Sequence, residues 1–257
     1  MVETSRLYTY SKDDTDRPKV TSEDINHISL FDNYFYFFKM SDLHKKSADQ
    51  IKNYFELNQV IVTRLINFIS LNDLCIFDNN DIEFSVKDLV SYYSSASCVP
   101  LKTSGDNRCL FHAISLCLYG SEKFTHLIKI SCVFTLLNNE SYFKKVLKQQ
   151  DCMLSFEKLV ENNGDNDVWG DHFSLMALSI LIRRPIYTYS SYKNSCSNTN
   201  PFNYSSMPVK IILFNSHFSA IVPFNYFNNY GYVPIIKNEL NQRDSIKSDS
   251  VVVINID

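Results

Sequence analysis

The sequence of 257 residues holds little glycine, proline or tryptophan, with 5, 7 and 1 residues of each. So few glycines and prolines exclude a collagen-like or low-complexity chain. Tyrosine and phenylalanine are by contrast abundant, with 16 and 19 residues, and hydrophobic residues make up 45% of the chain. This composition predicts a globular protein, and a chain of this length can bury roughly 70% of its unfolded surface in a core.

The chain also lacks a surplus of basic residues, since its formal net charge is -3. Such a charge balance does not favour the neutralisation of phosphates or anionic lipids, so we expect neither a nucleic acid nor a membrane as partner. Apolar runs such as IVTRLINFI (61–69) are interrupted by charge and are far shorter than the ~20 residues of a spanning helix. No transmembrane segment is therefore predicted.

Closely spaced cysteine pairs are absent, although the chain has 7 cysteines. An odd, scattered set predicts free thiols, and the N-terminus lacks the basic-then-apolar pattern of a signal peptide. Both features indicate a reducing, intracellular and cytoplasmic location. A zinc site at Cys109, His112 and Cys117 would lack a CxxC pair, so we expect no metal and no other cofactor.

Changes in polarity and hydrophobic periodicity divide the chain into four predicted parts. Residues 1–20 are polar and without periodicity, as is typical of a mobile arm, and 21–95 form a mainly helical extension that begins with an aromatic-rich segment. Residues 96–232 form the principal domain. The tail, 233–257, is polar and ends in VVVINID, which could pair as an edge strand.

Capping signals and periodicity place the predicted helices and strands. Ser47 and Gln50 form a capping-box pattern at the start of a long helix that ends near Leu71. Glycine is expected to end the helices before Gly120 and Gly164. The other predicted helices cover 86–93, 122–137, 142–148, 155–163 and 172–184, and the predicted strands cover 74–77, 82–84, 186–189, 209–214 and 218–222, with a polar loop at 190–206.

The stretch SGDNRCLFHAISLCLYG (104–120) joins a polar turn to a helix with an apolar stripe, and Cys109 lies at the boundary. A helix N-terminus lowers the pKa of a thiol and so favours the nucleophilic thiolate. The turn, with Asn107 and Arg108, would aim backbone N–H groups at the space above the sulfur and form an oxyanion hole. From this stretch alone, Cys109 could equally be a small buried apolar residue.

A general base for such a cysteine must come from elsewhere in the chain. Among the six histidines, His217 lies between two predicted strands, a rigid and edge-exposed place for an imidazole. His112 stands one turn beyond Cys109 on another face of the same helix, and His172 follows Asp171, where helix capping is the favoured role. The other three, interpreted as packing residues, are His27, His44 and His126.

At these residues the chain resembles a known family. GDNRCLFHAISLCLYG resembles the nucleophile motif of the ovarian-tumour (OTU) family of cysteine proteases, typically Asp-Gly-x-Cys-Leu-Phe-Arg-Ala. VWGDHFSLMALSILIRRPIYTY is similar to the family's Trp-Gly segment, buried helix and strand, and VKIILFNSHFSAIVP to its closing hairpin with the catalytic histidine. The three blocks stand in the family's order over roughly 96–232.

The resemblance implies an α+β, papain-like OTU fold, with a small central and mostly antiparallel β-sheet between helical layers and an N-terminal helical extension. It further implies a thiol protease that removes ubiquitin or a ubiquitin-like modifier from conjugates, with a viral or mobile-element type as one alternative. Cys109 then takes the position of the nucleophile, His217 that of the base, and Asp106 the acidic position three residues before the cysteine.

A channel for the diglycine tail of ubiquitin is expected at Trp169, Gly170 and Asp171, with Phe218, because only glycine permits such close backbone approach. The alternative for Trp169 is a place in the core.

Departures from the family pattern concern the loop and the third member of the triad. Asn107 stands in place of the usual glycine, which is tolerable because asparagine accepts positive φ, and Arg108 and His112 also differ from the commonest residues. Ser219 occupies the position where many members carry the Asp or Asn that orients the imidazole. Serine offers no negative charge, so the orienting group is left open between Ser219, Asp106 and an upstream acid.

Two other functions are considered. A protease of the same fold could process a polyprotein. A catalytically impaired ubiquitin-binding module is the other, and the presence of both Cys109 and His217 argues against it. The sequence indicates no oligomeric state.

Overall fold

The computed structural model describes residues 7–8, 42–71, 75–76, 82–86, 98–190, 192 and 195–223. The strands of its main sheet are β3 (Cys98–Leu101), β4 (Ile186–Ser190), β5 (Ser195–Thr199), β6 (Val209–Phe214) and β7 (His217–Pro223). The α-helices are α2 (Ala48–Leu57), α3 (Gln59–Leu71), α5 (Cys109–Tyr119), α6 (Thr125–Asn138), α7 (Glu140–Gln149), α8 (Phe156–Gly164) and α9 (His172–Ile182). Two 3-10 turns, η2 (Phe84–Val86) and η3 (Glu122–Phe124), and a short pair, β1 (Leu7–Tyr8) with β2 (Cys75–Ile76), complete the described elements.

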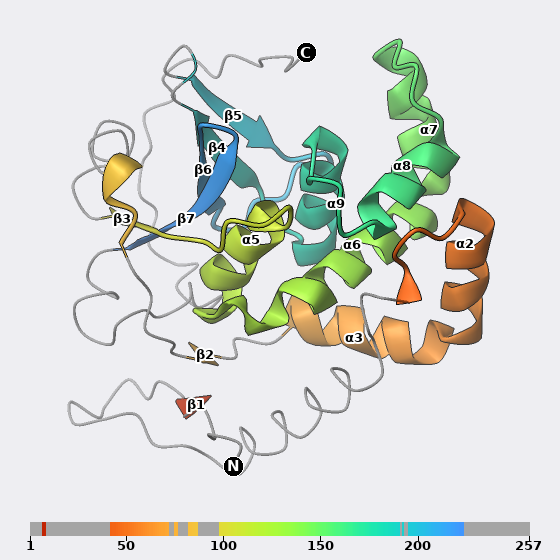
Figure 1. Ribbon diagram of the computed structural model, residues 1–257, viewed down its shortest axis with the longest axis horizontal. Helices are drawn as coiled ribbons and strands as arrows, with labels where there is room; N and C mark the ends of the chain where they lie inside the picture. The colour runs from red at the N-terminus through yellow and green to blue at the C-terminus, as the bar shows by residue number, and fades with distance from the viewer. Residues whose placement is uncertain are drawn as a thin grey trace.

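The five-stranded sheet has the order β3-β7-β6-β4-β5. Its neighbours are antiparallel except for the parallel pair β4 and β6. The structure thus confirms the predicted α+β class with a mostly antiparallel sheet. In Figure 1 the sheet lies on the left, with α5 beside it and the other helices to the right. None of the described helices is long and apolar enough to cross a membrane.

The hairpin of β6 and β7 places His217. Phe214 pairs with His217, so the connection consists of Asn215 and Ser216 alone. Both have positive φ, at 49° and 62°, as the mirror-image turns of two-residue hairpins require. His217 is therefore the first residue of β7, immediately after a tight turn.

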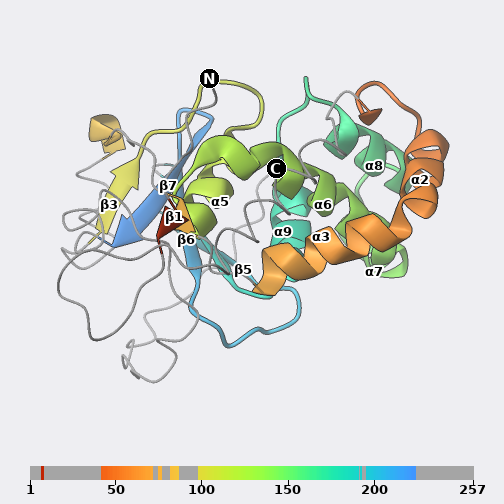
Figure 2. The ribbon, with the colours of Figure 1, turned by 90° about the horizontal axis from the view of Figure 1, so that it is seen from below.

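One face of the sheet packs against α5. This face and α5 form one hydrophobic core together with α2, α3, α6, α8 and α9. Figure 2 shows the same arrangement from below, with α5 between the sheet and α6. Successive side chains of β6 point to opposite faces of the sheet. Ile211 therefore lies in this core, and Ile212 lies in a smaller cluster on the opposite face with Val86, Tyr189 and Ile221. Among the described residues, the helices of the main core all lie on the α5 side.

Strand β5 corrects the prediction of a polar loop over 190–206. Its residues, SCSNT, pair with β4 and form one edge of the sheet. An edge strand that is mostly part-exposed needs no alternation of apolar residues, so the hydrophobic pattern missed it. The opposite edge, β3, was likewise not predicted; it pairs with β7.

Capping signals were more reliable than helix lengths. The capping box of Ser47 and Gln50 is confirmed, but the predicted single helix divides at Asn58, whose side-chain N–H donates to the Tyr54 carbonyl oxygen. The second half, α3, does end at Leu71. Gly120 ends α5 in the left-handed region with φ of 67°, as predicted.

The described part of the N-terminal extension shares the main core rather than forming one of its own. A Cβ added to Gly164 would lie 2.9 Å from Ile51 Cδ1, so α8 and α2 pack backbone to side chain. The predicted boundary near residue 95, the aromatic-rich segment within 21–40 and the tail 233–257 lie outside the described residues, as does nearly all of the predicted arm.

Candidate active site

Cys109 is the first residue of α5, and only 4% of its surface is exposed. The backbone N–H groups of Phe218, Leu110 and Cys109 itself lie near the sulfur and favour its thiolate form. Because α5 packs on β7 and Phe218 directly follows His217 in the chain, Cys109 lies near the start of β7. Phe218 is itself buried.

Burial raises the pKa of the Cys109 thiol above its ordinary value, against the lowering effect of the three N–H groups. The negative charge of Asp106 raises the pKa further. This outcome differs from the lowering expected at a helix N-terminus, because removal of the thiolate from water outweighs the backbone hydrogen bonds. At a given pH the resting site holds more protonated thiol than an exposed cysteine would.

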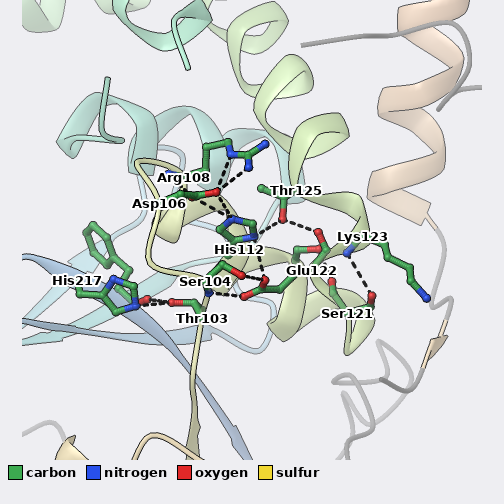
Figure 3. Close-up of polar contacts among 12 residues, drawn as sticks. Thr103, Ser104, Asp106, Arg108, His112, Ser121, Glu122, Lys123, Thr125 and His217 are labelled. Atoms are coloured by element: carbon green, nitrogen blue, oxygen red, sulfur yellow. Dashed lines mark hydrogen bonds and ion pairs between the residues drawn. The ribbon is translucent and has the colours of Figure 1, made fainter. Parts of the chain in front are cut away.

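His217 contacts a residue that sequence reasoning missed. Thr103 is buried and lies two residues after the end of β3. Its Oγ1 is 2.7 Å from His217 Nε2 and 2.5 Å from the Phe218 carbonyl oxygen. Figure 3 shows His217 pointing toward Thr103. Ser219 is buried but makes no hydrogen bond with His217 within the described part of the chain. Only the pairing of β3 with β7, which the sequence did not predict, could have revealed Thr103.

Asp106 faces its own loop and helix. Its carboxylate accepts hydrogen bonds from the Arg108 backbone N–H at 2.8 Å, from Arg108 Nη2 at 2.6 Å and from His112 Nε2 at 3.0 Å. Partial burial acts to raise the pKa of Asp106, but the hydrogen bonds from Arg108 and His112 prevail and lower it to about 2. Across the described residues, no hydrogen bond joins Asp106 to His217.

His112 ties the loop to the next helices. Its Nδ1 lies 2.8 Å from Thr125 Oγ1 and 3.4 Å from Glu122 Oε2. Glu122 in turn accepts the Ser104 backbone N–H at 2.8 Å and the Ser104 hydroxyl. Figure 3 shows this chain of contacts running from Asp106 to Ser104. The loop before the nucleophile is therefore held at both ends by groups from α5 and η3.

The backbone of the predicted oxyanion loop is partly engaged. The Arg108 N–H donates to Asp106 Oδ1, and the Cys109 N–H lies at a longer 3.3 Å from the Asp106 carbonyl oxygen. Asn107 accepts a hydrogen bond from the indole N–H of Trp169 through its side-chain oxygen. This link joins the nucleophile loop to the segment between α8 and α9.

The three predicted channel residues of that segment have distinct contacts. Trp169 is 54% exposed, so the alternative of a core residue is wrong. A Cβ added to Gly170 would lie 2.5 Å from Leu110 Cδ2. Asp171 caps α9 by a reciprocal capping box with Ser174, as its position before the helix predicted.

Two residues outside the predicted site, Lys129 and His44, hold this segment. Lys129 of α6 is fully buried, and its Nζ donates to the Asp165 carbonyl oxygen at 2.5 Å. Burial lowers the pKa of Lys129 to about 8. His44 Nδ1 lies 2.9 Å from Asp165 Oδ1. His44, Asp165 and Asp167 also place donor atoms within 4.8 Å of one another.

Comparisons with known proteins agree on one family. The family model described as Vertnin, OTU domain, matches residues 100–158. The chain is 24% identical over 98 residues to OTU domain-containing protein 5 of Homo sapiens. The aligned residues cover 38% of this chain and only 16% of that relative's length. It is 23% identical over 150 residues to OVARIAN TUMOR DOMAIN-containing deubiquitinating enzyme 12 of Arabidopsis thaliana. This alignment covers 56% of this chain and 66% of that relative.

A solved structure of an ovarian tumor (OTU) domain in complex with ubiquitin is also similar, with 16% identity and a TM-score of 0.45, over 58% of this chain and 78% of that one. The family model and both relatives carry the OTU domain in their descriptions, which confirms the resemblance to the ovarian-tumour family that the three sequence blocks predicted.

Proposed function

We propose that this chain is a cysteine-dependent hydrolase that removes ubiquitin, or a ubiquitin-like modifier, from conjugates. The observation that carries the proposal is the position of Cys109 at the start of α5, with its sulfur near the N–H of Phe218, the residue after His217. A thiol and an imidazole held together in this way are the elements of acyl transfer. A protonated resting thiol requires such a base, since burial disfavours the free thiolate.

In the proposed reaction His217 takes the thiol proton of Cys109 as the sulfur bonds to the carbonyl carbon of the modifier's C-terminal glycine. The imidazolium then gives the proton to the leaving amine as the C–N bond breaks, which leaves a thioester. Water, deprotonated by His217, attacks the thioester and releases the carboxylate and Cys109. The Cys109 N–H, whose contact with Asp106 is long, is the donor best placed to turn toward the oxyanion.

The diglycine tail of the modifier suits the narrow access to Cys109. With 4% of its surface exposed, the nucleophile can be reached only by a thin segment of substrate. We place that segment between Phe218 on one side and Trp169 and Gly170 on the other, where Asn107 fixes the indole. The six cysteines from Cys98 to Cys196 have free thiols, which accords with a reducing, cytoplasmic setting.

The test uses a ubiquitin probe with an electrophile at its C-terminus. We expect the wild-type chain to form a covalent adduct and Cys109→Ala to form none, with an unchanged circular dichroism spectrum. Cys152→Ala removes a part-exposed free cysteine and serves as the matched control that keeps labelling. Adduct formation by Cys109→Ala would rule out the assigned nucleophile. Labelling of neither ubiquitin nor ubiquitin-like probes, together with cleavage of a flanking polyprotein segment, would favour the polyprotein-processing alternative.

A further inference from the structure

The buried hydroxyl of Thr103 lies between two groups of the β7 strand. Its Oγ1 is 2.7 Å from His217 Nε2 and 2.5 Å from the carbonyl oxygen of Phe218. Thr103 exposes 3% of its surface, so no water competes for these contacts. Both distances are those of hydrogen bonds, and the hydroxyl has a single proton to share between them.

The proton of the hydroxyl belongs to the Phe218 contact. A carbonyl oxygen can only accept, and two oxygen atoms this close without a proton between them would repel each other. The Thr103 O–H therefore donates to Phe218, and its oxygen lone pair faces His217. The contact with His217 is then a hydrogen bond that the ring's Nε2–H donates to Thr103 Oγ1.

This assignment decides the tautomer of His217. A neutral imidazole carries one N–H, so a proton on Nε2 leaves the lone pair of Nδ1 free to act as a base. Neither rival from the sequence serves this purpose within the described residues, because the Asp106 carboxylate bonds Arg108 and His112 and Ser219 makes no hydrogen bond with the ring.

We propose that Thr103 is the positioning residue of His217: it fixes the ring orientation and the Nε2–H tautomer, so that Nδ1 is the general base toward Cys109. The inference rests on the proposed function for its catalytic meaning, but the tautomer itself does not. A neutral hydroxyl provides orientation without the charge of an aspartate. Its loss should therefore lower kcat by about tenfold to a hundredfold, less than the ~10⁴-fold of a lost triad carboxylate.

The experiment compares four variants with the wild-type chain. Thr103→Val removes the hydroxyl at nearly constant volume, and Thr103→Ser restores it. Thr188→Val is the matched control, because Thr188 is an equally buried threonine, in β4, whose hydroxyl has no hydrogen-bond partner within the described residues. Ser219→Ala tests the rival orienting residue. Ring nitrogens of ¹⁵N-labelled His217, assigned with His217→Gln, report the tautomer, and a fluorogenic ubiquitin substrate reports kcat and KM.

We expect Nε2–H as the neutral form in the wild-type chain and in Thr103→Ser, and a mixture of tautomers in Thr103→Val with lower kcat and unchanged KM. Thr188→Val should match the wild-type chain. An Nδ1–H tautomer in the wild-type chain, an unaltered ring in Thr103→Val, or a loss confined to Ser219→Ala would overturn the inference. If no variant acts on ubiquitin, the proposed function fails, while the nitrogen spectra still decide whether Thr103 fixes the tautomer.

Discussion

The Cα of Gly170 lies so close to Leu110 that an added Cβ would be 2.5 Å from Leu110 Cδ2 and 3.2 Å from Leu110 Cβ. Leu110 is buried and follows the nucleophile directly. The segment between α8 and α9 thus rests on the first turn of the nucleophile helix. A side chain at position 170 would overlap the Leu110 side chain, which must then move next to Cys109.

Gly170→Ala is expected to destabilise the fold and slow the reaction of Cys109. Overpacking of this kind costs about 1–3 kcal/mol, measured as a lower urea midpoint. The effect is steric, since the left-handed region is not occupied at Gly170. Gly105→Ala is the control within the nucleophile loop, because its Cβ would meet nothing within 4 Å. Equal stability of the two variants would contradict the packing described.

Local signals in the sequence predicted much of this scaffold. The capping boxes at Ser47 and Asp171 and the left-handed Gly120 are interactions within a few residues, so the sequence contains all of their parts. The same holds for the strand pattern of β6. The resemblance to the OTU family added the prediction that Cys109 and His217 act together, which no local rule supplies.

Contacts between distant segments could not be predicted in this way. Thr103 has no sequence signal of its own, and it meets His217 only because the register of β3 on β7 places it there. The burial of Lys129 against the Asp165 carbonyl oxygen depends on how α6 packs on α8. The raised pKa of Cys109 likewise follows from burial, which depends on the whole core, whereas helix position alone suggested the opposite.

The thiol of Cys109 is expected to react with iodoacetamide with a pH midpoint above that of a free cysteine, because burial raises its pKa. Asp106 adds to this shift through its negative charge. Asp106→Asn should therefore move the midpoint to lower pH, toward more thiolate at neutral pH. The measurement is the alkylation rate between pH 6 and 10, with the adduct mapped to Cys109. A midpoint that rises in Asp106→Asn would mean that the carboxylate assists thiolate formation instead.

Ser216→Gly is expected to stabilise the β6–β7 hairpin. Asn215 and Ser216 both have positive φ, and glycine at the second position suits such a turn best. Glycine at position 216 relieves the strain that serine has in the left-handed region, but glycine also loses more conformational entropy on folding. The net stabilisation is about 0.5–1 kcal/mol. Ser216→Val should change the urea midpoint in the opposite direction. Were both substitutions to leave the midpoint unchanged, the turn would not limit the stability of this hairpin.

Trp169 is the single tryptophan of the chain, so tryptophan fluorescence reports on the surroundings of this one indole. The indole is 54% exposed, and its N–H donates to the Asn107 side chain. Asn107→Ala should free the ring, shift its emission to longer wavelength and increase quenching by acrylamide. Asn198→Ala, at an exposed asparagine of β5, serves as the control and should leave both unchanged.

The same fluorescence tests the place assigned to the substrate tail. Added ubiquitin should cover the indole in the Cys109→Ala variant, which binds without reacting, so the emission should shift to shorter wavelength and acrylamide quenching should fall. In Asn107→Ala combined with Cys109→Ala the shift should require more ubiquitin, because the ring must first be ordered. A tail bound elsewhere would leave the emission of Trp169 unaltered at saturating ubiquitin.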